Sequence, residues 1–195
     1  EFDSQGSYDL LVKVKPDNEN TVVIGGTNLF ISTDGFASSA ATRWIGGYTS
    51  DNTSYAPYPN HHADQHSFVF LSGSSALSGH DGGITRTTNI LANPVVWTSH
   101  NTGYLTTQCY TVALDHATTG SATILSGFQD NGVWQGNSTS GTATWTEQFG
   151  GDGSYVAIAN GGTSRYVSSQ SGNPYRFFGS NQFARMTPDP PAPPA

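Results

Sequence analysis

Side chains that could carry acid–base chemistry occur in short, glycine-rich phrases of this chain. Asp81 stands in the sequence HDGG, Asp130 in QDNG and Asp152 in GGDG. Two carboxyl groups about 5 to 9.5 Å apart provide the acid and the base, or the acid and the nucleophile, of glycoside cleavage. Asp81 paired with Asp130 or Asp152 is therefore the candidate catalytic set.

These three aspartates also have a simpler interpretation as turn residues. Each lies within two residues of a glycine. Asp and Asn bond their own backbone and tolerate left-handed geometry, while Gly takes positive φ freely. A carboxylate that caps its own turn, or bonds backbone amides between sheets, needs no catalytic role. We favour this interpretation for all three.

A separate pattern, His-x-Asp-x-His, is formed by His62, Asp64 and His66. Alternate residues of an extended segment point the same way, so these side chains could hold a transition metal. No fourth ligand stands nearby in the sequence. We therefore expect a hydrogen-bonded cluster at a junction between sheets, and we predict neither a bound metal nor a cofactor.

Polar and aromatic residues around these phrases make up the predicted binding surface. Trp134 follows the Asp130 turn and is the best candidate for an exposed aromatic, whereas Trp44, Trp97 and Trp145 are expected to pack between sheets. The predicted binding residues are His61, His62, Asp64, His66, His80, Gln129, Asn131 and Trp134.

The phrases belong to a repeated unit of short strands. Aligning Gly25, Gly79, Gly127 and Ser168 gives four copies at spacings of about 54, 48 and 41 residues, near those of propeller blades. β-Branched and aromatic runs alternate with turn residues, and no apolar stretch keeps a helical period. The sequence predicts an all-β array of about four antiparallel sheets with almost no helix. The predicted blades are 8–50, 66–100, 108–148 and 154–187, followed by a Pro-rich linker or tail at 188–195.

Composition limits the classes of partner. Seven Lys and Arg against fourteen Asp and Glu give a net charge of −7, which argues against nucleic acid. No apolar run is long enough to span a bilayer, so no membrane insertion is predicted. Low Lys with abundant Ser, Thr, Asn and Gly is typical of an exported protein, so we expect an extracellular or cell-surface location and a signal peptide removed before Glu1. Cys109 is expected to be a small buried residue.

An ordered set of phrases resembles the exported β-propellers with BNR or Asp-box repeats, in the sortilin-like and xyloglucanase-like group. The phrases begin at Gln5 (QGSYD), Ser32 (STDG), His62 (HADQH), Asp81 (DGGI), Gln129 (QDNG) and Gly150 (GGDG). The resemblance implies that the four blades are an arc of a larger ring. The Asp-boxes are degenerate, because Phe36 stands where that family has Gly and Asn89 replaces Asp in the second copy. They therefore support the fold and not a sialidase activity.

A propeller arrangement predicts where the phrases meet. The segments around His61 to His66 and Gly150 to Gly153 precede first strands, and the Asp81 and Asp130 turns join second to third strands. All four are expected at one rim near the axis. The Asp34 and Asn89 turns are expected on the opposite face.

Three classes of function follow. The leading class is a non-catalytic extracellular module that binds a polymer, such as a polysaccharide, or a peptide or partner subunit. The second is a glycoside hydrolase that uses paired rim carboxylates. The third is a structural surface-assembly protein whose open sheet edges join a remaining propeller half or further copies of the chain.

Overall fold

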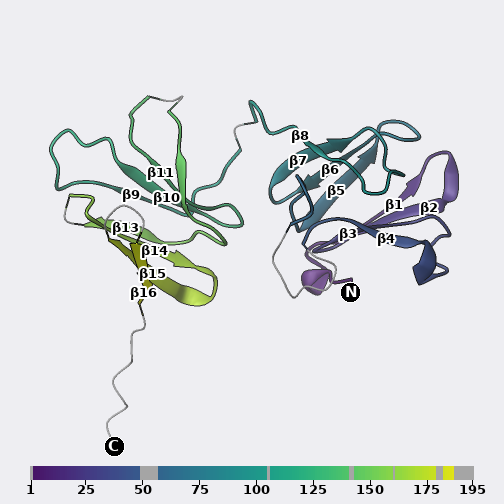
Figure 1. The fold of residues 1–195 in the computed structure, drawn as a ribbon, viewed down its shortest axis with the longest axis horizontal. Coiled ribbons are helices and arrows are strands. Elements are labelled where there is room, and N and C mark those ends of the chain that lie inside the picture. Colours follow the sequence, from purple (N-terminus) through teal and green to yellow (C-terminus); the bar gives the residue numbers. More distant parts are fainter. Residues whose placement is uncertain are drawn as a thin grey trace, which may run out of the picture. The chain divides into compact units, whose positions relative to one another are not determined.

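Small antiparallel sheets make up the fold of the residues that the structure describes. The computed structural model describes residues 2–48, 57–104, 106–140, 143–159, 161–178 and 182–186, and the predicted tail at 188–195 lies outside them. Within these residues there are four sheets of four strands, each in chain order, and no α-helix (Figure 1). The predicted all-β fold of about four antiparallel sheets is confirmed.

Short strands and tight connections make up each sheet. The first holds β1 (Leu11–Lys15), β2 (Asn18–Gly25), β3 (Leu29–Ser32) and β4 (Thr42–Gly46). The second holds β5 (Gln65–Phe70), β6 (Ala76–His80), β7 (Gly83–Thr87) and β8 (Thr98–Ser99). The third holds β9 (Thr111–Leu114), β10 (Ile124–Phe128), β11 (Gly132–Gly136) and β12 (Thr146–Phe149). The fourth holds β13 (Val156–Ala159), β14 (Ser164–Ser169), β15 (Asn173–Phe178) and β16 (Gln182–Arg185). Single 3₁₀ turns occupy Gln5–Ser7, Ser39–Ala41 and Gln170–Gly172.

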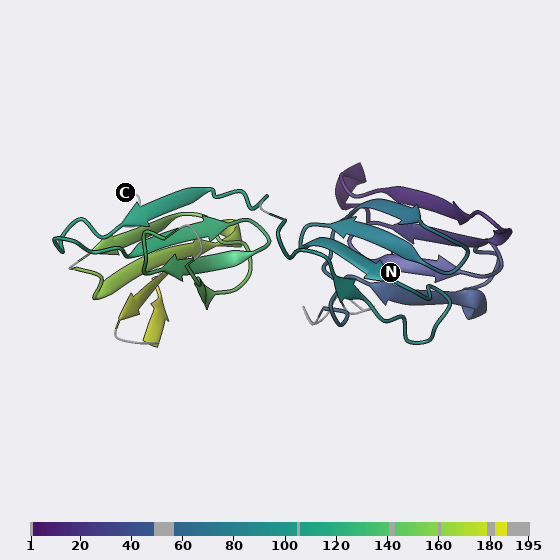
Figure 2. The ribbon, with the colours of Figure 1, turned by 90° about the horizontal axis from the view of Figure 1, so that it is seen from above.

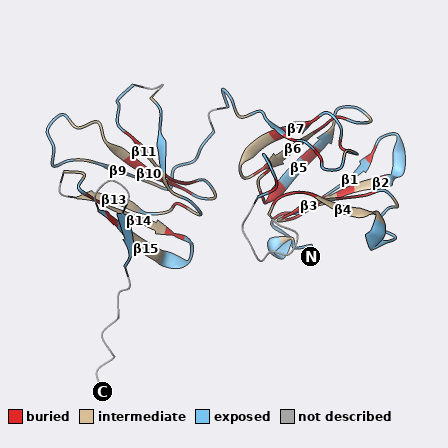
Figure 3. Ribbon diagram, in the orientation of Figure 1, coloured by how far each residue is buried: buried red, intermediate tan, exposed pale blue. Residues whose placement is uncertain are grey.

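The chain divides into two compact units, residues 1–105 and 106–195, each containing two sheets. In the first unit one face of the β1–β4 sheet packs against one face of the β5–β8 sheet (Figure 2). Val23 and Ile31 from one sheet and Phe68 from the other are at most 1 % exposed. In β2 the buried positions recur with a period of two, because successive side chains of a strand point to opposite faces. Figure 3 shows buried segments in both sheets of this unit.

Trp97 closes the core of the first unit. Its side chain is 1 % exposed, and its indole N–H donates a hydrogen bond to the carbonyl oxygen of Ile45 at 2.7 Å. The bond satisfies the one polar atom of a ring that otherwise contributes apolar area. The predicted packing role of Trp97 is thus confirmed.

The second unit has a smaller core, formed by Leu125 and Val133 from one sheet and Val167 and Phe177 from the other. Two sequence predictions are wrong here. Trp145 is 37 % exposed and its ring lies over Gly136 of the neighbouring strand in its own sheet, so it does not fill an inter-sheet core. Cys109 is exposed, because it lies in the irregular segment before β9 rather than within a strand.

Candidate functional site

In the first unit, a carboxyl cluster forms where three connecting segments meet. Asp9 precedes β1, Asp64 precedes β5, and Asp81 lies in the turn between β6 and β7. Asp64 has a φ of +62°, and its N–H donates to the carbonyl oxygen of Thr27 at 3.0 Å. That bond attaches the residue before β5 to the connection between β2 and β3. The local backbone thus directs Asp64 toward the tip of the β6–β7 turn.

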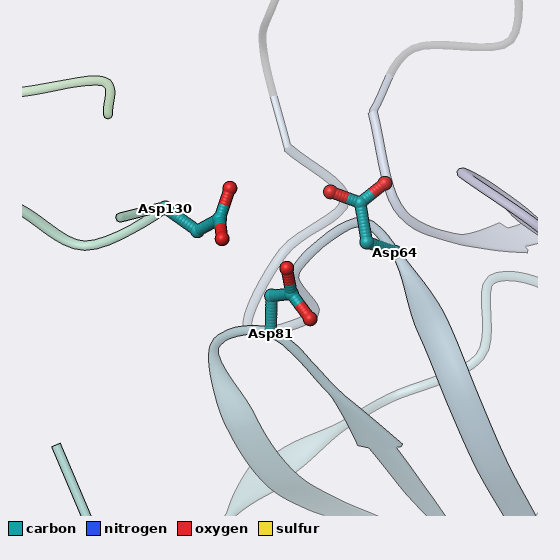
Figure 4. Close-up of side chains that lie close together, drawn as sticks. All are labelled: Asp64, Asp81 and Asp130. Carbon is teal, nitrogen blue, oxygen red and sulfur yellow. The ribbon is translucent and has the colours of Figure 1, made fainter. Parts of the chain in front are cut away.

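The carboxyl groups of this cluster lie close together. Oxygen atoms of Asp64 and Asp81 are within 4.8 Å of one another, and Figure 4 shows the two side chains rising from the same end of the second sheet. His66 hydrogen-bonds through Nε2 to Asp81, while its Nδ1 lies 3.7 Å from an oxygen of Asp9. The side-chain amide of Gln5 donates to Asp64. One imidazole thus connects two of the three carboxyl groups.

Asp9 is the most enclosed member of the cluster. It is 0 % exposed, and neither of its carboxylate oxygens accepts a hydrogen bond from an N–H or hydroxyl group of the described residues. Its polar neighbours are the ring of His66 and the carboxyl groups of Asp64 and Asp81. A buried carboxylate without donors carries a large desolvation cost. Asp9 is therefore unlike the aspartates of this chain that cap turns.

The crowding shifts the protonation of these groups. Burial, followed by repulsion from Asp9 and Asp81, raises the pKa of Asp64 to about 7. Burial also raises the pKa of Asp9, although attraction to His66 opposes that shift. The carboxyl group of Asp64 therefore holds a proton up to near neutral pH, because it is buried and lies close to two other carboxyl groups.

A group of histidines lies next to the carboxyl cluster. The ring of His61 is 4.6 Å from that of His80 and 4.5 Å from that of Trp97, and the ring of His62 stacks on His80 at 6.2 Å. His61 accepts a hydrogen bond from the N–H of Gly47 at 3.2 Å. Burial, followed by repulsion from His80, lowers the pKa of His61 well below its usual value. Burial likewise lowers the pKa of His80 to about 4.

The three residues of the His-x-Asp-x-His pattern do not point to one place. His62 stacks on His80, whereas His66 bonds Asp81 and contacts the ring of Tyr8 edge-on at 5.5 Å. The left-handed backbone of Asp64 interrupts the alternation that an extended segment would give. The predicted residues are therefore divided between a histidine group and a carboxyl cluster.

In the second unit, the other two candidate catalytic aspartates lie in connected turns. Asp130 has a φ of +62°, and its N–H donates to a carboxylate oxygen of Asp152 at 3.2 Å. The N–H of Asp152 in turn donates to the side-chain oxygen of Gln170 at 3.1 Å. A Cβ added to Gly153 would lie 1.8 Å from the carbonyl oxygen of Gly132, so the two turns approach as closely as glycine allows. Asp152 joins the turns together.

Polar and aromatic groups are exposed beside these turns. The indole N–H of Trp134 donates to the carbonyl oxygen of Asn131 at 2.6 Å, which leaves this ring half-buried against its own turn. The hydroxyl of Tyr110 donates to the side-chain oxygen of Gln129, and Tyr110 is 53 % exposed. Tyr155 is 76 % exposed. Gln129, Asn131 and Trp134 thus share a surface with two tyrosines.

Several residues of these sites were not among the sequence candidates. Gln5 and Asp9 belong to the phrase QGSYD, which served only to identify the start of a repeat, although Asp9 lies two residues before β1. Tyr110 and Tyr155 each precede a first strand. Recognising that the same position recurs in two repeats would have found both tyrosines.

Neither a family model nor a curated protein matches this chain. Among the residues described, no helix has the length and apolar character needed to cross a bilayer.

Proposed function

We propose that this chain forms blades of an exported β-propeller that binds a neutral polysaccharide without cleaving it. Four-stranded meanders that pack face to face within each unit support the propeller arrangement. The ordered phrases that resemble BNR and Asp-box propellers point the same way. The binding function rests on one observation in the second unit, the pair of exposed tyrosines beside an amide-bearing turn.

The starts of β9 and β13 lie side by side at this surface. The hydroxyl of Thr111 donates to the carbonyl oxygen of Ser154 at 2.7 Å and accepts from the N–H of Val156 at 3.1 Å. Tyr110 and Tyr155 lie directly beside this contact in the chain, and both side chains are exposed. A tyrosine combines a flat apolar ring with a hydroxyl group, so it stacks on a sugar ring and also donates or accepts a hydrogen bond.

The neighbouring groups favour a neutral ligand. Gln129 and Asn131 offer amide donors and acceptors that match sugar hydroxyls. The chain has a net charge of −7, which disfavours an acidic polymer. In the second unit Asp152 is engaged by the N–H of Asp130, so a turn role accounts for this carboxylate without catalysis.

Affinity electrophoresis through gels containing xyloglucan, mixed-linkage β-glucan or mannan tests the proposal. We expect at least one neutral polymer to retard the chain, and polygalacturonate to have no effect. Tyr110→Ala and Tyr155→Ala should each weaken binding about tenfold, because each removes one stacking ring. Tyr104→Ala is the matched control, since Tyr104 is also exposed at 47 % but lies in the first unit.

Other outcomes separate the alternatives. Release of new reducing ends that disappears in folded Asp81→Asn and Asp130→Asn variants would replace this proposal with glycoside hydrolysis. Concentration-dependent multimers without retardation by any polymer would favour the assembly protein. Equal retardation of the wild type and both tyrosine variants would remove the proposed surface.

A further inference from the structure

In the carboxyl cluster of the first unit, one buried carboxyl group lacks, among the described residues, the hydrogen-bond donors that would stabilise its ionised form. Asp9 is fully buried, and both of its carboxylate oxygens lack a hydrogen-bond donor within the described chain. Native proteins satisfy such groups with a donor, a proton or a cation. Besides the ring of His66, its neighbours are the carboxyl groups of Asp64 and Asp81, which add negative charge when they are ionised.

The three carboxylates converge from separate segments. Oxygen atoms of Asp64 and Asp81 lie within 4.8 Å of one another. Asp9, in the segment before β1, lies 3.7 Å from the imidazole of His66 and interacts electrostatically with Asp64 and Asp81. His66 uses its other nitrogen to bond Asp81. The imidazole therefore contacts two of the three carboxylates and helps to hold them in position, as the hydrogen-bonding partners of ligand carboxylates do in metal sites.

We propose that Asp9, Asp64 and Asp81 bind one calcium ion through their carboxylate oxygens. Calcium is favoured among metal ions because it takes six to eight oxygen ligands in flexible geometry, and carboxylates bind it through one or both oxygens. Zinc and copper favour imidazole or thiolate ligands, whereas both nitrogens of His66 face carboxylates. Water and the side-chain oxygen of Gln5, after rotation of its amide group, would complete the shell.

The ion would connect the N-terminal segment to the second sheet. Asp9 lies before β1 of the first sheet, while Asp64 and Asp81 lie at the end of the β5–β8 sheet. Calcium would thus act as a non-covalent cross-link between the two sheets of the first unit. This inference is independent of the proposed polysaccharide surface, which lies in the second unit.

The proposal is tested by calorimetry and luminescence on the full chain, after treatment with EDTA and removal of the EDTA. We expect calcium chloride to bind at one site with millimolar or tighter affinity, as in other extracellular modules, and to raise Tm by about 5 °C at saturation. Terbium, which replaces calcium at oxygen sites, should give luminescence on excitation of tyrosine, because the ring of Tyr8 lies 5.5 Å from that of His66.

Matched variants locate the site. Asp9→Asn and Asp81→Asn should each weaken calcium binding at least tenfold and reduce the terbium signal. Asp17→Asn removes one carboxylate from the same unit, where Asp17 pairs with Lys15 away from the cluster, and should bind as the wild type does. Asp81 lies in a turn, so its variant tests the site even where Asp9→Asn fails to fold.

The assignment is overturned if the folded wild type binds no calcium at millimolar concentration, if Asp81→Asn binds calcium as the wild type does, or if Asp17→Asn loses binding equally. Binding of magnesium or zinc in place of calcium would likewise reject calcium as the occupant. None of these outcomes depends on whether the chain binds a polysaccharide, so the calcium proposal and the proposed function can fail separately.

Discussion

At the scale of single residues, one buried serine organises the turn that resembles an Asp-box. The hydroxyl oxygen of Ser32 accepts the N–H groups of Asp34 at 3.1 Å and Phe36 at 2.9 Å, and its own proton goes to Asp34 at 2.7 Å. Phe36 has a φ of +65° at the position where the related pattern has glycine. The turn thus keeps its shape through hydrogen bonds although the residue best suited to that backbone is missing. In the second sheet Thr87 plays a similar part by accepting the N–H of Asn89 at 3.2 Å.

Replacing Ser32 by alanine should destabilise the first unit by about 1–3 kcal/mol, because two backbone N–H groups lose their acceptor at a side chain that is 0 % exposed. Chemical denaturation measures this loss. Thr33→Ala, an exposed neighbour in the same turn, should change stability by less than about 0.5 kcal/mol. Equal stability of both variants would show that water replaces the serine hydroxyl.

At the scale of elements, the segment that leads into β5 holds the first unit together. His61 lies against Trp97 and His80, and a Cβ added to Gly46 at the end of β4 would lie 2.4 Å from its Nδ1. The side-chain amide of Gln65, at the start of β5, donates to the carbonyl oxygen of His62 at 2.9 Å. These contacts place the imidazoles of His61 and His80, whose pKa values are lowered by burial, in the interior of the first unit.

The buried His61 makes the stability of the first unit depend on pH. Its pKa is lower in the folded state than the unfolded value of 6.5, so below pH 6.5 the unfolded chain binds more protons. This contribution is fully favourable above pH 6.5 and is lost as pH falls from there toward the folded pKa, at up to about 1.4 kcal/mol per pH unit. The raised pKa of Asp64 acts in the opposite direction. The difference in pH-dependent stability between the wild type and a His61 variant therefore measures the contribution of this histidine.

His61→Asn should therefore reduce the loss of stability between pH 7 and pH 5, because asparagine offers an acceptor to Gly47 but does not titrate. Urea denaturation in EDTA at the two pH values gives the slopes. His100→Asn is the control, since His100 is exposed. Parallel pH profiles for the wild type and His61→Asn would contradict a buried neutral His61.

The pattern of turns and strands could be predicted from the sequence, whereas the sites could be predicted only in part. Gly next to Asp or Asn identified the turns at Asp81 and Asp130, because local backbone preferences decide them. The side chain of Asp64 lies near that of Asp9, which is 55 residues away in the chain, and its direction depends on the positive φ of Asp64. No periodicity in the sequence predicts such a contact. Burial of Cys109 was predicted from residue type alone, and its irregular surroundings proved that wrong.

At the scale of the whole molecule, each unit has a core of its own. The residues that bury Phe68 all lie before residue 105, and those that bury Leu125 all follow it. Apolar area buried within a unit stabilises only that unit, because the hydrophobic contribution depends on local contacts. We therefore expect the two units to unfold as separate cooperative transitions.

Phe68→Ala should destabilise the first unit by about 3–5 kcal/mol, and Leu125→Ala should destabilise the second by about 2–5 kcal/mol, since each leaves a cavity at a side chain at most 1 % exposed. Hydrogen exchange followed by mass spectrometry assigns each loss of protection to its peptides. In Phe68→Ala, strands β9 to β16 should keep wild-type protection. In Leu125→Ala, strands β1 to β8 should keep wild-type protection. If either substitution lowers protection equally across all the strands of the described residues, the units share one folding transition, and stability in one sheet pair then depends on the other.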